Sequence, residues 1–242
     1  MKSRLLVLQH GKWQNAGNFL SNLAGQFSVE IYTVENSGES LPDCSDFDAL
    51  ILPGYPANGN LGEHIHALQM EKQFLRDWLA LNKPFLGFGS GYQLLAEAFG
   101  ATVTPDFMNS AGFIEGYLTH DGREHPLFNG IPPNISLLQW YNPPMLTPVP
   151  QNCLLLATSR ECVVEAFTIK GCPHIIAMRC NNHIAHPDDV SRWVKNGPDY
   201  VKEQLPEENP GELFLDQAEK LLETNRKVFR KLIVNFMSFT KK

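Results

Sequence analysis

The chain has 242 residues, of which 43% are hydrophobic, and a formal net charge of −6 at pH 7. This length and composition predict one α/β domain with a sizeable core, and no Lys/Arg-rich block marks a surface for nucleic acid or an anionic membrane. The first apolar run is about five residues long, too short for a signal peptide. The five cysteines include no CxxC pair. We therefore expect a reduced, cytoplasmic protein with neither a membrane nor a nucleic-acid partner.

Apolar runs alternate with helical periodicities through the first hundred residues. Runs typical of strands occupy residues 4–9, 29–34, 49–52 and 84–88, and apolar residues at helical spacing predict helices at 15–27, 68–81 and 90–99. Strands that alternate with helices predict right-handed βαβ units and a doubly wound, mostly parallel sheet.

The pattern changes after Gly100. Strand-like segments rich in Gly and Pro follow at 113–118, 135–140, 153–158, 163–169 and 175–179, and we expect them to extend the sheet with antiparallel strands. Residues 187–210 are polar and acidic, which predicts a connecting segment. Asn209-Pro210-Gly211-Glu212 has the residues of a helix start and predicts a long C-terminal helix at 210–239 that closes a single domain of residues 1–242.

The stretch KPFLGFGSGYQLLAEAFG, residues 83–100, joins a predicted strand to a predicted helix through closely spaced glycines. Such a nucleophile elbow places one side chain at the carboxyl end of a parallel strand, above a helix N-terminus that can stabilise an oxyanion. The tip of this turn is Gly89, and we expect it to have a positive φ.

PFLGFGSGYQLLA resembles the nucleophile motif of class I glutamine amidotransferases such as the glutaminase of GMP synthase, P-x-L-G-[IV]-C-x-G-x-Q-x-L-A. The family's cysteine falls on Gly89. ILPGYP at 51–56 is similar to the family's oxyanion strand, and HPLFNGIP at 125–132 and LQWYNPP at 138–144 continue the resemblance. It implies a flavodoxin-like fold and, in an active member, release of ammonia from glutamine through a thioester. We expect neither a cofactor nor a metal.

The family's catalytic histidine and glutamate lie in G-x-Q-[FW]-H-P-E, which resembles AMRCNNH at 177–183. Asn181 then stands at the histidine position and His183 at the glutamate position. Gly89 offers no nucleophile, Asn181 has no pKa near neutrality, and His183 is not an anion that could orient a base. These three replacements predict a pseudoenzyme that binds an unidentified protein partner or small-molecule ligand.

The resemblance also implies which residues line the oxyanion or ligand pocket, namely Gly54, Tyr55, Ser90, Gln93, Trp140 and Tyr141. An active hydrolase or amidotransferase on the same scaffold is the alternative, with Ser90, Cys180 or His183 in the chemistry. Ser90 is equally suited to start the following helix, and Cys180 to be a buried core cysteine. Ammonia release from glutamine distinguishes the two hypotheses.

Overall fold

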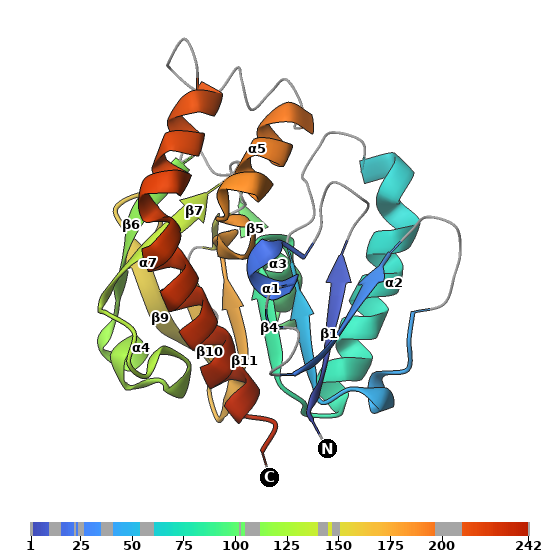
Figure 1. Cartoon of the computed structure of the whole chain (residues 1–242). Helices are drawn as coiled ribbons and strands as arrows, with labels where there is room; N and C mark the ends of the chain where they lie inside the picture. The colour runs from blue at the N-terminus through green and yellow to red at the C-terminus, as the bar shows by residue number, and fades with distance from the viewer. Residues whose placement is uncertain are drawn as a thin grey trace.

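The computed structural model describes residues 2–9, 16–21, 23, 27–34, 41–53, 61–101, 103–104, 112–139, 145–146, 151–196 and 210–241. Within these residues a nine-stranded sheet crosses the molecule in the order β2-β1-β3-β4-β11-β10-β9-β6-β7 (Figure 1). Its strands are β1 (Arg4–Gln9), β2 (Ser28–Thr33), β3 (Ala49–Leu52), β4 (Phe85–Phe88), β6 (Gly112–Leu118), β7 (Asn134–Gln139), β9 (Cys153–Ser159), β10 (Ala166–Ile169) and β11 (Cys172–Met178). A separate pair joins β5 (Val103–Thr104) to β8 (Met145–Leu146).

The half of the sheet formed by β2, β1, β3, β4 and β11 is parallel throughout. All four residues of β3 and of β4 are buried, because helices cover both faces of this half. The predicted mostly parallel, doubly wound sheet is confirmed.

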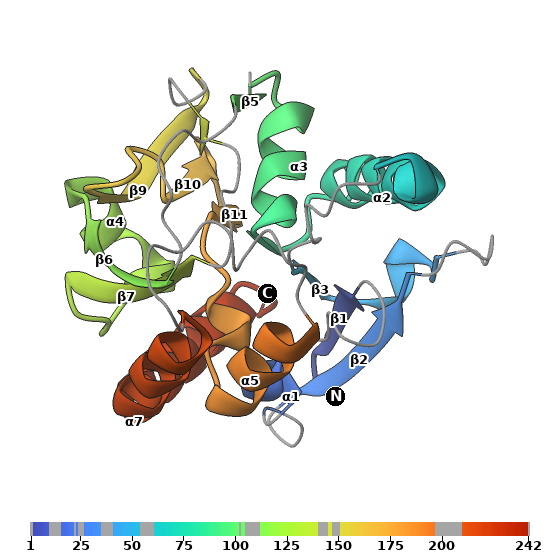
Figure 2. The ribbon, with the colours of Figure 1, turned by 90° about the horizontal axis from the view of Figure 1, so that it is seen from above.

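The other half is antiparallel, from β11 through β10, β9 and β6 to β7, as predicted. This half of the sheet curls, as Figure 2 shows. Its last strand, β7, therefore lies beside Asn182, in the segment that follows β11. The side chain of Asn182 accepts from the N–H of Leu138 and donates to the carbonyl of Ser136, both at 2.7 Å. Asn182 thus satisfies two backbone groups on the free edge of β7 and joins this strand to the chain after β11.

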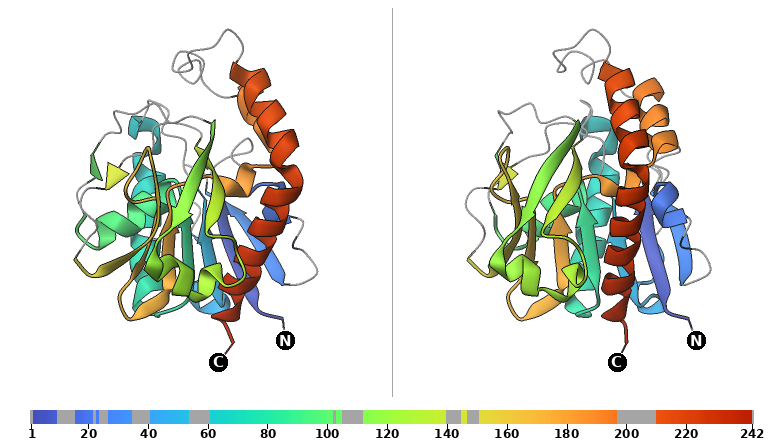
Figure 3. Two further views of the ribbon diagram at one scale, coloured as in Figure 1. Left: turned by 90° about the vertical axis from the view of Figure 1, so that its left-hand side faces the viewer. Right: turned by 60° about the vertical axis from the view of Figure 1, so that its left-hand side comes forward.

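Helices α2 (Leu61–Ala80) and α3 (Ser90–Ala98) cover one face of the parallel half. Helices α1 (Asn18–Ser21), α5 (Pro187–Asn196) and α7 (Pro210–Ser238) cover the other (Figure 2). Short helical turns complete the described part: α4 (His120–Glu124), η1 (Cys44–Asp46), η2 (Pro126–Phe128) and η3 (Asn182–Ile184). Figure 3 shows α7 running along the outside of the molecule, and its Asn235 donates to the carbonyls of Leu127 and Asn129 around η2. The predicted long C-terminal helix is confirmed, and no described helix is both long and apolar enough to span a membrane.

The predicted helix at 15–27 is wrong in extent, because its described part contains only the four residues of α1. Gly17 has a φ of +84°, and a Cβ at this position would lie 2.0 Å from the carbonyl oxygen of His183. The chain therefore turns at Gly17 to fit against η3 instead of continuing a helix. Other boundaries moved less: α2 begins at Leu61 rather than 68, and β10 begins at Ala166 rather than 163.

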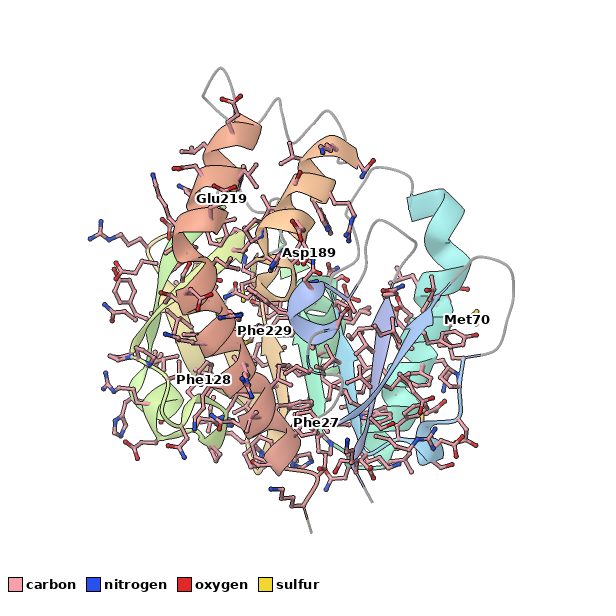
Figure 4. All side chains as sticks on the ribbon, in the orientation of Figure 1. Phe27, Met70, Phe128, Asp189, Glu219 and Phe229 are labelled. Atoms are coloured by element: carbon pink, nitrogen blue, oxygen red, sulfur yellow. The ribbon has the colours of Figure 1, made fainter. Side chains whose placement is uncertain are left out.

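The predicted connecting segment at 187–210 contains a helix that the sequence pattern did not predict, α5 (Pro187–Asn196). Val190 and Trp193 are buried on its inner side. Asp189, labelled in Figure 4, accepts from the backbone N–H of Asn18 at 2.7 Å and from its side-chain amide at 2.9 Å. The buried carboxylate of Asp189 thus ties α5, which has few apolar residues of its own, to the start of α1. Residues 197–209 of the predicted segment lie outside the described residues.

Candidate functional site

Gly89 forms the sharp turn between β4 and α3, with φ of 52° and ψ of −109°. Its N–H donates to the carbonyl of Met178, the last residue of β11, at 3.1 Å, and its own carbonyl accepts from the N–H of Gln93 at 3.2 Å. The turn therefore sits at the carboxyl ends of two adjacent parallel strands, where open α/β sheets bind ligands. The predicted positive φ is confirmed.

The other glycines of this stretch allow α3 to start very close to the sheet. A Cβ at Gly91 would lie 2.3 Å from the carbonyl oxygen of Leu52, and a Cβ at Gly87 would lie 2.6 Å from the backbone of Gly91. The repeated glycines of GFGSG are thus required by contact between the first turn of α3 and the ends of β3 and β4.

The segment Arg179–His183 leaves β11 beside the Gly89 turn, since Met178 is paired with Phe88. Asn181 and His183 are both buried, and within the described residues Asn181 Nδ2 and His183 Nδ1 have no hydrogen-bond partner. The His183 ring packs on the Phe88 ring, with 5.3 Å between centroids. The residue that the resemblance places at the family's glutamate position is therefore a core histidine in contact with Phe88, which precedes Gly89.

Burial lowers the pKa of His183 from its ordinary value of 6.5 to about 3, so the folded protein holds this ring neutral. In the unfolded chain His183 binds a proton as the pH falls through 6.5, whereas in the folded chain it stays neutral until about pH 3. The stability contributed by neutral His183 is complete above pH 6.5 and is lost as the pH falls toward 3.

We expect His183→Gln to remove this dependence. Between about pH 6 and pH 4, the free energy of unfolding should fall with decreasing pH more steeply in the unsubstituted protein than in the variant. The two slopes should differ by about 1.4 kcal/mol per pH unit. Urea unfolding at a series of pH values measures the difference. His125, whose pKa burial lowers to about 4, acts in the same direction but is present in both proteins. Equal slopes would contradict a buried, neutral His183.

A buried polar cluster lies next to the Gly89 turn. Glu165 accepts from Ser159 Oγ at 2.7 Å and from Gln139 Nε2 at 2.9 Å, and its Oε1 is 3.4 Å from Nη1 of Arg179. The side chains of Glu165 and Arg179 are fully buried. Tyr92, in the first turn of α3, donates to the carbonyl of Val164 at 2.8 Å. The cluster therefore links β7, β9, β10, β11 and α3 at the edge of the sheet that carries Gly89.

The sequence patterns did not predict this cluster, although the resemblance of AMRCNNH to G-x-Q-[FW]-H-P-E places Arg179 at the glutamine position. A signal was present, because the predicted strands 163–169 and 175–179 each contain one charged residue among apolar neighbours. A charge of each sign within buried strands indicates a buried pair. Burial raises the pKa of Glu165, while Arg179, Ser159 and Gln139 oppose that change.

The remaining candidate residues fall into two groups. Gly54, Tyr55, Trp140 and Tyr141 lie outside the described residues. Ser90 is the first residue of α3, and the amide of Gln93 donates to Glu97 at 2.7 Å, whose carboxylate also pairs with Lys72 of α2. Cys180 is fully buried, and burial raises the pKa of its thiol to about 12. A ligand pocket lined by Ser90, Gln93 and the four residues outside the described part stays a prediction.

The family model "Glutamine amidotransferase class-I" matches residues 16–178. No curated protein sequence matches. Among solved structures, a glutamine amidotransferase from Thermotoga maritima is similar, with a TM-score of 0.84, 18% identity, and coverage of 98% of this chain and 99% of that one.

Two further structures share the fold. A glutamine amidotransferase from Methylobacillus flagellatus has a TM-score of 0.72 and 19% identity, covering 97% of this chain and 96% of its own. A protein from Thermoplasma acidophilum that is described as a GMP synthase subunit has a TM-score of 0.62 and 21% identity, covering 99% and 96%. Because the family match spans well over half of the 242 residues, this chain belongs to the class I glutamine amidotransferase family.

Proposed function

We propose that this chain is a class I glutamine amidotransferase-like protein that does not hydrolyse glutamine and acts as a binding or regulatory pseudoenzyme. The observation that carries the proposal is Gly89, which occupies the turn between β4 and α3 where the family's motif has its cysteine. Without a side chain at this turn, no thioester can form there.

The residues after β11 support the proposal. The family match ends at Met178, directly before the segment that would carry the proton-transferring histidine and its glutamate. Asn181 has no proton to exchange near neutral pH, and the buried His183 is neutral. A base and its anionic partner are therefore both lacking at the positions that the family uses.

The alternative nucleophiles fit an active hydrolase poorly. Cys180 is inaccessible, and a thiol with a pKa of about 12 supplies almost no thiolate at neutral pH. Ser90 would need an adjacent base, and His183, which follows β11 beside the turn, packs against Phe88 with a pKa of about 3. We infer that the site formed by the Gly89 turn and the segment after β11 binds a partner or ligand and does not react with it.

The test is ammonia release from glutamine and from γ-glutamyl compounds by the purified protein. We expect release at the background level, with an active glutaminase of the family as the positive control in the same assay. Ser90→Ala and Cys180→Ala proteins are measured in parallel. Ammonia release above background that either substitution abolishes would establish an active hydrolase and overturn the proposal.

A further inference from the structure

The charges on the exposed side of α7 are separated by sign along the helix. Its first half carries exposed acidic residues and its second half exposed basic residues. The acidic residues are Glu212, Asp216, Glu219 and Glu223, and the basic residues are Arg226, Lys227, Arg230 and Lys231. Lys220 is the one basic residue of the acidic half. The sign of the charge thus changes between Glu223 and Arg226, near the middle of a 29-residue helix.

The helix dipole does not account for this separation. A dipole favours acidic residues in the first turn and basic residues in the last turn, and its effect falls off beyond them. Only Glu212 lies in the first turn of α7, and its last turn contains no basic residue. Most of these charges are therefore placed where the dipole has little influence.

The arrangement is unfavourable within a single chain. Neighbours four residues apart share a sign at Glu219 and Glu223 and again at Arg226 and Arg230, and such pairs destabilise a helix by roughly 0.2–0.5 kcal/mol each. In the described part of the helix, two ion pairs offset this, Lys220–Asp216 at 2.6 Å and Arg226–Glu223 at 2.7 Å. Both are exposed and contribute little.

We propose that the exposed side of α7 binds the same side of α7 in a second copy of this chain, antiparallel and about a two-fold axis. A two-fold axis near the change of sign sets the acidic half of each helix against the basic half of the other. Glu219 and Arg230 lie equally far from the midpoint between residues 224 and 225, so each faces the other across the axis. Leu213 and Val234, which are 41% and 39% exposed near the two ends of α7, add apolar contact.

The position of α7 leaves this side accessible. Its inner side is fixed on the sheet through buried residues such as Phe229 and Phe236, and Figure 4 shows Glu219 on the upper part of the helix, on the outside of the molecule. The interface depends mainly on charge, so we expect a dimer that weakens with salt.

The test is sedimentation velocity of the full chain over a range of concentrations. At about 0.01 M salt, where charges act over about 30 Å, we expect a species of twice the 27.2 kDa chain mass. At about 1 M salt, where the range is about 3 Å, we expect the monomer. A monomer at every concentration and salt level would overturn the proposal.

Single charge reversals decide which surface is responsible. Glu219→Lys and Arg230→Glu should each weaken self-association by about tenfold or more, since each places like charges together twice per dimer. Each also creates an opposite-charge neighbour within its own helix, with Glu223 or with Arg226, so the fold should not be weakened. An equimolar mixture of the two variants should associate again, and so should the double variant E219K/R230E.

Matched reversals elsewhere serve as controls. Arg123→Glu and Glu124→Lys make the same changes of net charge on α4, where both residues are exposed, and should leave self-association unchanged. A dimer that survives both α7 reversals would place the interface elsewhere. If Arg230→Glu weakens the dimer, Glu219→Lys does not and the mixture fails to recover, the basic half of α7 binds some other surface of the second copy, and the proposed pairing of α7 with α7 is wrong.

Discussion

Replacing Arg179 with methionine should lower the free energy of unfolding by about 3–5 kcal/mol. The substitution removes the cationic neighbour of the Glu165 carboxylate. Both side chains are fully buried, so solvent cannot take its place. Ser159 and Gln139 still donate to that carboxylate, but neutral donors do not balance a buried charge. Urea unfolding at pH 7 measures the loss.

Two further variants separate the pair from its surroundings. In R179M/E165Q the orphaned charge is removed, and we expect most of the lost stability to return, because neutral replacement of a buried pair costs little. Arg4→Met provides the control: Arg4 and Glu30 are closer, at 2.9 Å, but are 43% and 48% exposed. Its loss should be about 0–1 kcal/mol. Equal effects at Arg179 and Arg4 would show that burial does not govern the Glu165–Arg179 pair.

The second large effect concerns cysteine at the tip of the turn. Gly89→Cys should react with iodoacetamide much faster than the native buried cysteines, because the N-terminus of α3 stabilises a thiolate there. Burial instead raises the pKa of Cys153 to about 11 and that of Cys180 to about 12. The positive φ of residue 89 should cost about 1–3 kcal/mol of stability once the residue has a side chain.

Gly100→Cys is a matched control, because Gly100 follows the C-terminus of the same helix, also has a positive φ (+74°), and would place a Cβ in open space. At the C-terminal end the helix dipole disfavours a thiolate, so its apparent pKa should be higher than that of Gly89→Cys. Alkylation rates across a pH series give both values. Equal pKa values would mean that the Gly89 turn does not direct the α3 dipole at the reacting atom.

Reactivity should not become catalysis. Gly89→Cys alone should release no ammonia from glutamine, because Asn181 cannot transfer the proton. Adding Asn181→His and His183→Glu supplies a base and its anionic partner. We expect slow turnover at best, since the new carboxylate would replace a ring packed against Phe88 in the core. Efficient turnover by Gly89→Cys alone would reveal a base that the proposed function does not include.

The parallel half of the sheet and the turn at Gly89 were predictable from local patterns of residues. Strands such as Arg4–Gln9 and Ala49–Leu52 could be predicted because uninterrupted apolar runs are needed when helices cover both faces. The positive φ of Gly89 could be predicted because closely spaced glycines between a strand and a helix indicate a sharp turn. Local sequence and short-range sterics were sufficient for both.

Other features depend on residues far apart in the chain and became visible only in the folded structure. The α1 helix stops short because Gly17 fits against the carbonyl of His183, and α5 forms in a polar segment where Asp189 binds Asn18. Glu165 and Arg179 are single charges in the predicted apolar strands 163–169 and 175–179. The pairing of β10 with β11 brings the two charges together. In each case the deciding contact joins residues far apart in the chain, so packing sets it and no local pattern encodes it.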